Sequence, residues 1–97
     1  MATNWDDGKA TTNLQKHGVA FSDCWELLHS NVPMLEIEDV DHSDIEQRFI
    51  AFGPLHRRIV MVVFSVDDEG EIDRIVSARA AEKEEVTIYQ EWRESWP

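Results

Sequence analysis

The chain has 97 residues and a mass of 11.3 kDa, a length that allows one compact domain and excludes two independent hydrophobic cores. A formal net charge of -11 excludes a broad basic nucleic-acid-binding surface, so any such site must be local. The single cysteine, Cys24, excludes an internal disulfide framework and indicates a reducing compartment.

The apolar residues are sufficient for a folded core but not for a membrane span. Hydrophobic residues make up 42% of the chain, so the high charge does not imply disorder. The longest aliphatic run, residues 59–64, is far shorter than a membrane-spanning helix, and the first residues lack the basic and apolar regions of a secretion signal. We therefore expect a single cytoplasmic domain, residues 1–97, with no membrane contact.

Two helices are predicted in the first third of the chain. Residues 7–17 form the first, which begins at an aspartate and ends in a left-handed turn at Gly18. Residues 22–28 form the second, with Ser22 as its N-terminal cap. Both have little apolar surface and should therefore pack against a sheet.

A sheet and a third helix are predicted in the rest of the chain. Apolar patterns predict four strands, at residues 34–38, 48–53, 59–64 and 72–77. The connections between the last three strands are short, which favours an antiparallel meander. Residues 81–96 predict a terminal helix. We therefore expect an α+β fold with about four antiparallel strands, two N-terminal helices and one C-terminal helix.

Three motifs occur in this order along the chain: Trp5-Asp6-x-x-Lys9-Ala10-x-x-Asn13-x-x-Lys16-His17-Gly18-Val19-x-Phe21, then Glu46-x-Arg48-x-x-x-x-Gly53, then Arg74-Ile75-Val76-Ser77-Ala78-Arg79-x-Ala81-x-x-x-Glu85-x-x-x-Tyr89. Each motif alone is weak, but three in register are specific. In this order and spacing they resemble the BrnT family of bacterial type II toxins, and the resemblance spans roughly residues 5–89.

The resemblance implies a RelE-like toxin fold and a ribonuclease that cleaves RNA without a metal and inhibits translation. It also implies a BrnA-type antitoxin protein, which blocks the toxin and binds DNA itself, so that the toxin meets DNA only indirectly. No cofactor and no metal site are expected, because the sequence has no glycine-rich phosphate loop and no Cys/His metal pattern.

Metal-free RNA cleavage needs a base for the 2′-hydroxyl proton, cations for the pentavalent phosphorane and an acid for the leaving 5′-oxygen. His17 is the predicted proton-transfer residue, because an imidazole can both accept and donate a proton near neutral pH. Arg74 and Arg79 are predicted to hold the scissile phosphate. Three further cations are predicted to bind RNA: Lys16, Arg48 and Arg58.

These residues also have structural explanations. Lys16 and His17 fall in the last turn of the first helix, where cations complement the helix dipole. Arg79, placed just beyond the last strand, could pair with Glu85 instead of a phosphate. Simple alternation along residues 72–77 places Arg74 on the same face as Ile72 and Val76, and Ser77 on the opposite face.

The chain departs from the family pattern after the last strand. Residues 80–85 are acidic where family members carry further basic residues, and Lys83 is the only cation among them. Acids here compete with a phosphate for Arg79. A second hypothesis is therefore a catalytically weakened BrnT-like module that acts as the antitoxin's partner and corepressor. A third is an acidic decoy for a basic nucleic-acid-binding protein.

Overall fold

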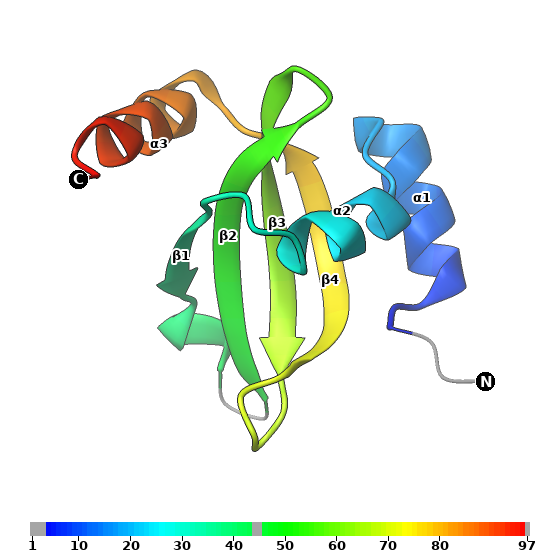
Figure 1. Cartoon of the computed structure of the whole chain (residues 1–97). Coiled ribbons are helices and arrows are strands. Elements are labelled where there is room, and N and C mark those ends of the chain that lie inside the picture. Colours follow the sequence, from blue (N-terminus) through cyan, green and yellow to red (C-terminus); the bar gives the residue numbers. More distant parts are fainter. Residues whose placement is uncertain (1–3, 44–45, 97) are drawn as a thin grey trace.

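The computed structural model describes residues 4–43 and 46–96, and these form an α+β fold (Figure 1). The four strands make one antiparallel sheet in the order β1-β2-β3-β4. The predicted fold class and the predicted order of helices and strands are therefore confirmed. In chain order the elements are α1 (Asp7–His17), α2 (Phe21–Leu28), β1 (Leu35–Glu38), the 3-10 helix η1 (Val40–His42), β2 (Gln47–Leu55), β3 (Arg58–Val66), β4 (Ile72–Ala80) and α3 (Lys83–Glu94).

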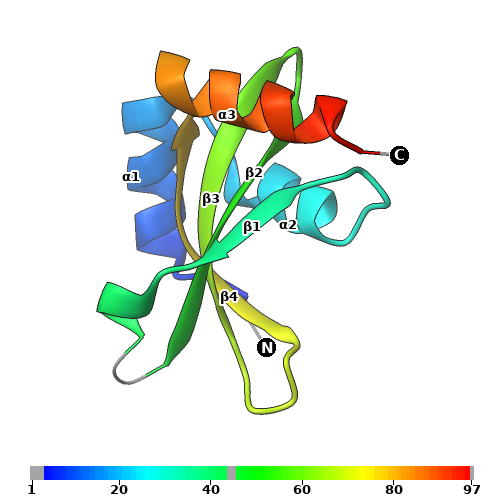
Figure 2. The ribbon, with the colours of Figure 1, turned by 90° about the vertical axis from the view of Figure 1, so that its left-hand side faces the viewer.

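Helices cover the sheet unequally. α1 and α2 pack on one face, against β4 and β2, and α3 crosses only one end of the other face (Figure 2). The main core lies between the first two helices and the sheet. α3 does not reach the lower part of the second face, and η1 packs near β2 at that end (Figure 2). The core residues are Val19, Phe21, Cys24, Leu27, Ala51, Val60, Val62, Phe64, Ile75 and Ala78.

The ends of the first two helices follow local chemistry. The Asp6 side chain accepts a hydrogen bond from the Lys9 backbone N–H at 2.9 Å, and Gly18, at φ 66°, ends α1 as predicted. The predicted Ser22 cap of α2 is wrong. The helix begins one residue earlier, at Phe21, and has no side-chain cap, because Phe21 is buried in the core and fixes the chain there.

The turn between β2 and β3 lies further along the chain than predicted. β2 continues through Pro54, which β1 does not pair, so a missing N–H is tolerated there. The turn consists of His56 and Arg57, with φ angles of 50° and 71°. Positive φ at both positions is the geometry of tight two-residue hairpins, usually supplied by Asn and Gly. Two non-glycine residues are therefore held in a backbone conformation that costs free energy.

β4 is longer than predicted and contains two irregularities. Arg79 lies inside the strand, opposite Met61, and not beyond the strand end. Val63 pairs with Ser77, but the next residue of β3, Phe64, pairs with Ile75, so Val76 has no partner on β3. The alternation of β4 side chains between the two faces of the sheet therefore shifts by one residue at Val76, and Arg74 pairs with Ser65. The predicted grouping of Ile72, Arg74 and Val76 on one face is therefore wrong. The second irregularity falls at Asp73.

The shift in β4 decides which side chains share the open face. Arg79 on β4 lies opposite Met61 on β3, which lies opposite Phe52 on β2. In the same way, Arg74 lies opposite Ser65, which lies opposite Arg48. Directly paired residues share a face, and so do residues two apart on a strand. Arg48, Arg74 and Arg79 therefore project from the same face of the sheet, the one that α1 and α2 leave open.

α3 is shorter than predicted at both ends. A reciprocal capping box of Glu82 and Glu85 starts the helix. Tyr89 is buried, and its hydroxyl donates to the Pro33 backbone oxygen at 2.8 Å. The hydroxyl thus ties α3 to the loop before β1.

Candidate functional site

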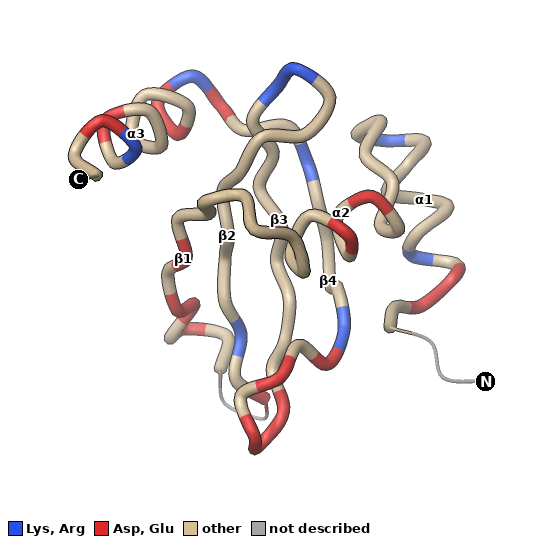
Figure 3. Tube along the Cα trace, viewed as in Figure 1, with Lys and Arg blue, Asp and Glu red and all other residues tan. Residues whose placement is uncertain are grey.

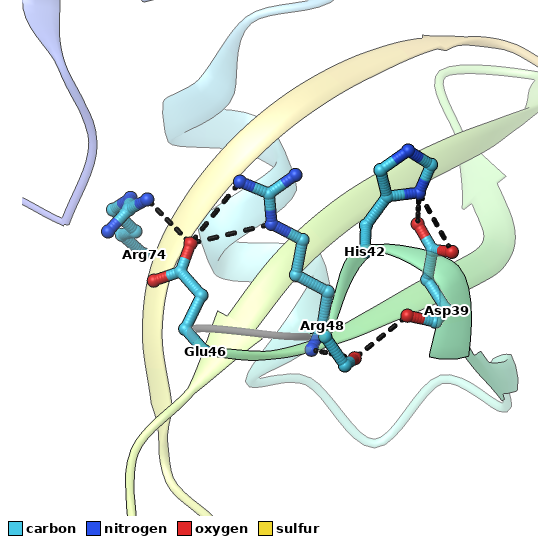
Figure 4. Close-up of polar contacts among 6 residues, drawn as sticks. Asp39, His42, Glu46, Arg48 and Arg74 are labelled. Atoms are coloured by element: carbon cyan, nitrogen blue, oxygen red, sulfur yellow. Dashed lines mark hydrogen bonds and ion pairs between the residues drawn. The ribbon is translucent and has the colours of Figure 1, made fainter.

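Two arginines and one glutamate meet in a compact polar cluster on the open face of the sheet (Figure 4). The Glu46 carboxylate accepts a hydrogen bond from Arg74 at 2.6 Å. The same oxygen accepts from Arg48 through Nε at 3.4 Å and Nη2 at 3.3 Å. We call these residues, Glu46, Arg48 and Arg74, the Glu46 cluster. It contains two arginines and one carboxylate, so it carries one excess positive charge in a strongly acidic protein.

The Glu46 cluster is accessible and its residues are placed by strand register. The Glu46 and Arg74 side chains are 23% and 42% exposed. Ser65 lies between Arg48 and Arg74 in the register, and its small side chain is fully buried beneath this face. Among the described residues, the Ser65 hydroxyl has no hydrogen-bond partner. The charged side chains of the cluster are therefore partly exposed to solvent.

Arg79 lies at the other end of β4 and is held by α3. Its Nη1 donates to Glu85 Oε1 at 2.8 Å and its Nη2 to Glu85 Oε2 at 3.0 Å. The bond to Glu85 raises the pKa of Arg79 and, in return, lowers the pKa of Glu85. The alternative of a structural ion pair with Glu85 is thus confirmed. Arg74 and Arg79 pair with Ser65 and Met61, which are four positions apart on β3, about 13 Å along an extended strand. In the structure the two arginines bind different carboxylates, Glu46 and Glu85.

His17 and Lys16 lie elsewhere, in a groove of about 540 Å³ beside the outer edge of β4. We call it the α1 groove. Lys9 also lines it, two helical turns before Lys16 and therefore on the same side of α1. The lining residues are Asp6, Gly8, Lys9, Thr12, Asn13, Lys16, His17 and Val76. This groove is a second candidate surface for an anion, separate from the Glu46 cluster.

Asn13 joins α1 to β4. It is the one buried residue of α1, and its side-chain amide pairs with both backbone groups of Ala78: it donates to the oxygen at 2.7 Å and accepts from the N–H at 3.2 Å. It also donates to the Val19 oxygen at 3.2 Å. One side chain thus occupies a position that a neighbouring strand would otherwise fill. Asn4 performs a similar role through its backbone oxygen, which accepts from the Ile75 N–H at 2.8 Å.

Basic residues gather at one end of the molecule (Figure 3). We call it the basic end. It combines the C-terminal ends of α1 and β4, the β2–β3 turn and the start of α3 (Figure 1). Acids accompany the cations, notably Glu85 beside Arg79, and the most uniformly acidic segment is the β3–β4 turn at the opposite end. The cations of the basic end are Lys16, Arg57, Arg58, Arg79 and Lys83.

Two bonds fix the β2–β3 turn against the first two helices. Arg58 Nη2 donates to the Gly18 backbone oxygen at 2.6 Å, at the end of α1. His56 Nε2 lies 3.1 Å from Asp23 Oδ2 on α2. These contacts, together with the positive φ angles of His56 and Arg57, hold the turn in a defined place at the basic end.

Comparison with known families gives one match. A family model described as "Ribonuclease toxin, BrnT, of type II toxin-antitoxin system" matches residues 5–85. The chain belongs to this BrnT family. Membership implies a ribonuclease toxin of a type II toxin-antitoxin system, with RNA as its target and an antitoxin as its partner. Searches among curated proteins and among solved structures gave no match.

In this BrnT-family chain the six predicted site residues fall into three places. Arg48 and Arg74 are in the Glu46 cluster, Arg58 and Arg79 are at the basic end, and Lys16 and His17 line the α1 groove. The sequence reasoning assigned no role to Glu46. The signal was present, because residues two apart on a strand share a face and the second motif places Glu46 two residues before Arg48.

The cysteine of the BrnT-family chain is not a candidate nucleophile. Burial of Cys24 raises the pKa of its thiol to about 12, which makes it a poor nucleophile. In residues 4–43 and 46–96, no group of three or more His, Cys, Asp or Glu side chains could hold a metal ion. Over the same residues, none of the helices is long and apolar enough to cross a membrane.

Proposed function

We propose that this chain is a toxin that cleaves RNA in the cytoplasm without a metal ion and thereby inhibits translation. The observation that supports it best is the Glu46 cluster in a member of a ribonuclease toxin family. A carboxylate within hydrogen-bond distance of two arginines combines a proton acceptor with phosphate-binding cations, as metal-free RNA cleavage requires.

In this proposal Glu46 accepts the proton of the 2′-hydroxyl. The 2′-oxygen forms a bond to phosphorus and the bond between phosphorus and the 5′-oxygen breaks, which leaves a 2′,3′-cyclic phosphate and a 5′-hydroxyl. Arg74 and Arg48 bind the non-bridging oxygens, whose negative charge increases in the transition state. A water molecule donates a proton to the leaving 5′-oxygen, and Glu46 then returns its proton to the solvent.

The other predicted site residues bind the RNA strand on either side of this centre. Arg79 shares the open face with Arg74 and can hold a phosphate further along the strand if it exchanges Glu85 for that phosphate. Lys16 and His17 offer a second cationic surface in the α1 groove. His17 is the alternative proton-transfer residue, and the experiment below distinguishes it from Glu46.

A BrnA-type antitoxin is the proposed partner. The antitoxin blocks the toxin and binds operator DNA itself, so the acidic toxin meets DNA only through the antitoxin. The net charge of -11 favours this arrangement, because most of the toxin surface repels a phosphate backbone.

One contact favours the second hypothesis, a catalytically weakened module that serves as the antitoxin's partner and corepressor. Both terminal nitrogens of Arg79 already bind the Glu85 carboxylate. A phosphate must displace an ion pair there, which reduces RNA affinity. In a weakened module this pair would be purely structural.

Growth arrest on induced expression separates these hypotheses. We expect the native chain to arrest growth, and Glu46→Gln or Arg74→Ala to relieve the arrest at matched soluble levels. Glu36→Gln, an exposed acid on β1, and Arg93→Ala, an exposed cation on α3, are the matched controls and should remain toxic.

Two other outcomes have defined meanings. Relief by His17→Ala but not by Glu46→Gln would move proton transfer to the α1 groove and leave the ribonuclease function in place. A native chain that is soluble, folded and harmless would exclude the active toxin and support the corepressor module.

A further inference from the structure

A pocket of about 340 Å³ opens at the basic end, between the β2–β3 turn, the exit of β4 and α3. This is the lower end of the size range of small-ligand sites in proteins. The proposed chemistry in the Glu46 cluster does not use it. Its lining residues are Pro54, Arg57, Arg58, Ile59, Ala80, Ala81, Val86 and Gln90.

The lining is apolar inside and polar at the rim. Ile59 and Val86 are half-buried, as are the two alanines at the end of β4. Arg57 and Gln90 are exposed. A flat aromatic ring with polar edges suits this division, because its faces bury against aliphatic side chains while an amide and a guanidinium remain free for its edges.

The pocket also lies on the course that an RNA strand would follow along β4. Arg74 and Arg79 project from the same face of this strand, and Ala80 and Ala81 come directly after Arg79. Ala80 pairs with Val60, which is five positions on β3 from Ser65, the partner of Arg74, or about 17 Å along an extended strand. A strand cleaved at the Glu46 cluster and bound by Arg79 therefore reaches the pocket several nucleotides from the cleaved bond.

The turn that forms one wall of the pocket is held in a strained conformation. His56 and Arg57 both have positive φ, and Arg58 is anchored to the Gly18 oxygen at 2.6 Å. Strain of this kind is found at ligand sites, where the surrounding contacts impose it. It fixes the backbone of Arg57 at the rim, so that its guanidinium can lie over a base or pair with the adjacent phosphate.

We propose that this pocket binds one nucleobase of the RNA substrate and gives the toxin a base preference at that position. The inference rests on the proposed ribonuclease function and deepens it. Gln90 supplies the edge contact that distinguishes bases, and Arg57 supplies the affinity for the attached phosphate. A nucleobase is favoured over an apolar side chain of a protein partner because two arginines border the pocket.

Binding of short RNAs that cannot be cleaved tests the proposal directly. The probes are 2′-O-methyl hexanucleotides that differ in the base at a single position, with binding followed by fluorescence anisotropy. For the native protein we expect affinities that differ by about fivefold or more between the best and the worst base at one position, as expected for one hydrogen-bonded base edge. Gln90→Ala should abolish this difference and reduce overall affinity less.

Ala81→Phe is a second variant, which fills the pocket without removal of a polar group. This variant should no longer distinguish between bases, and its unfolding temperature should stay near that of the native chain. Gln15→Ala, an exposed amide on α1 outside both the pocket and the α1 groove, is the control and should keep the preference.

The outcomes separate this proposal from the ribonuclease function. If the native protein does not discriminate between bases, or if discrimination survives both pocket variants, the base-binding proposal is overturned. Cleavage of RNA by the native chain would still support the ribonuclease function in that case. Discrimination without cleavage would support the pocket and count against catalysis. Ala81→Phe that binds RNA normally but no longer binds the antitoxin would overturn the proposal and assign the pocket to a protein partner.

Discussion

Asn13 shows how one buried polar residue can position a helix. α1 has a polar composition, and its single buried side chain satisfies the N–H and C=O of Ala78 on the outer edge of β4. The unpaired edge of a sheet is otherwise open to association with other chains. The same bonds fix the α1 groove against β4, and with it Lys16 and His17 one turn later.

Asn13→Ala should destabilise the fold by about 2–4 kcal/mol, because it leaves buried backbone groups of Ala78 and Val19 without partners. Urea unfolding monitored by tryptophan fluorescence measures this loss. Gln15→Ala, on the exposed side of the same helix, should change stability by no more than about 0.5 kcal/mol. Equal effects of the two substitutions would contradict the role of Asn13.

The Arg79–Glu85 pair makes stability depend on pH in a defined direction. The bond to Arg79 lowers the pKa of Glu85 in the folded state, so the pair contributes stability above the carboxyl's unfolded pKa. This contribution is lost as the pH falls through the lowered folded value. The Arg79–Glu85 pair therefore stabilises the fold at neutral pH, and acid removes this stabilisation.

Glu85→Gln should reduce stability by about 1 kcal/mol at neutral pH, since a partly exposed ion pair is worth little more. The difference from the native chain should shrink as the pH falls through the lowered pKa of Glu85. Glu84→Gln, an exposed acid in the same helical turn, should show no comparable pH dependence. A gap between native and Glu85→Gln that is constant with pH would contradict the assignment.

At the scale of elements, the β2–β3 turn and β4 determine what the basic end and the open face present. The turn keeps His56 and Arg57 at positive φ where Gly or Asn is usual. The irregularity at Val76 turns Arg74 and Arg79 to the same face. Both features depart from the simplest strand geometry, and both act on residues of the proposed site.

Arg57→Gly and Arg57→Ala both remove the cation, but only glycine relieves the left-handed backbone. We expect Arg57→Gly to be more stable than Arg57→Ala by about 1 kcal/mol in urea unfolding. Both variants should lose RNA affinity to the same extent. If alanine proves as stable as glycine, the strain attributed to this turn is absent.

Sequence patterns predicted those elements that local chemistry determines. Asp6 and Gly18 mark the ends of α1, and the apolar alternation locates the four strands but not all of their ends, because caps and periodicity act within a few residues. The shift at Val76 and the contacts of Asn13 depend on partners far along the chain, so local patterns do not contain them. For the same reason the separation of Arg74 from Arg79, and the convergence of Arg48 and Arg74 on Glu46, became visible only in the folded chain.

The whole molecule separates its charges in space although the net charge is -11. Cations occupy the basic end and the Glu46 cluster, and the β3–β4 turn at the far end is acidic (Figure 3). Such a distribution repels RNA from most of the surface and admits it at a few places. The same acidic faces are available for a basic antitoxin, which would associate faster at low salt.

RNA cleavage by the purified chain in the presence of EDTA tests the central claim most directly. The account predicts that the native protein cuts single-stranded RNA to products ending in 2′,3′-cyclic phosphate. Glu46→Gln should lower the rate by about 100-fold or more, as expected for loss of a general base, while Glu36→Gln cuts normally. No cleavage by folded native protein, or full activity of Glu46→Gln, would contradict the account.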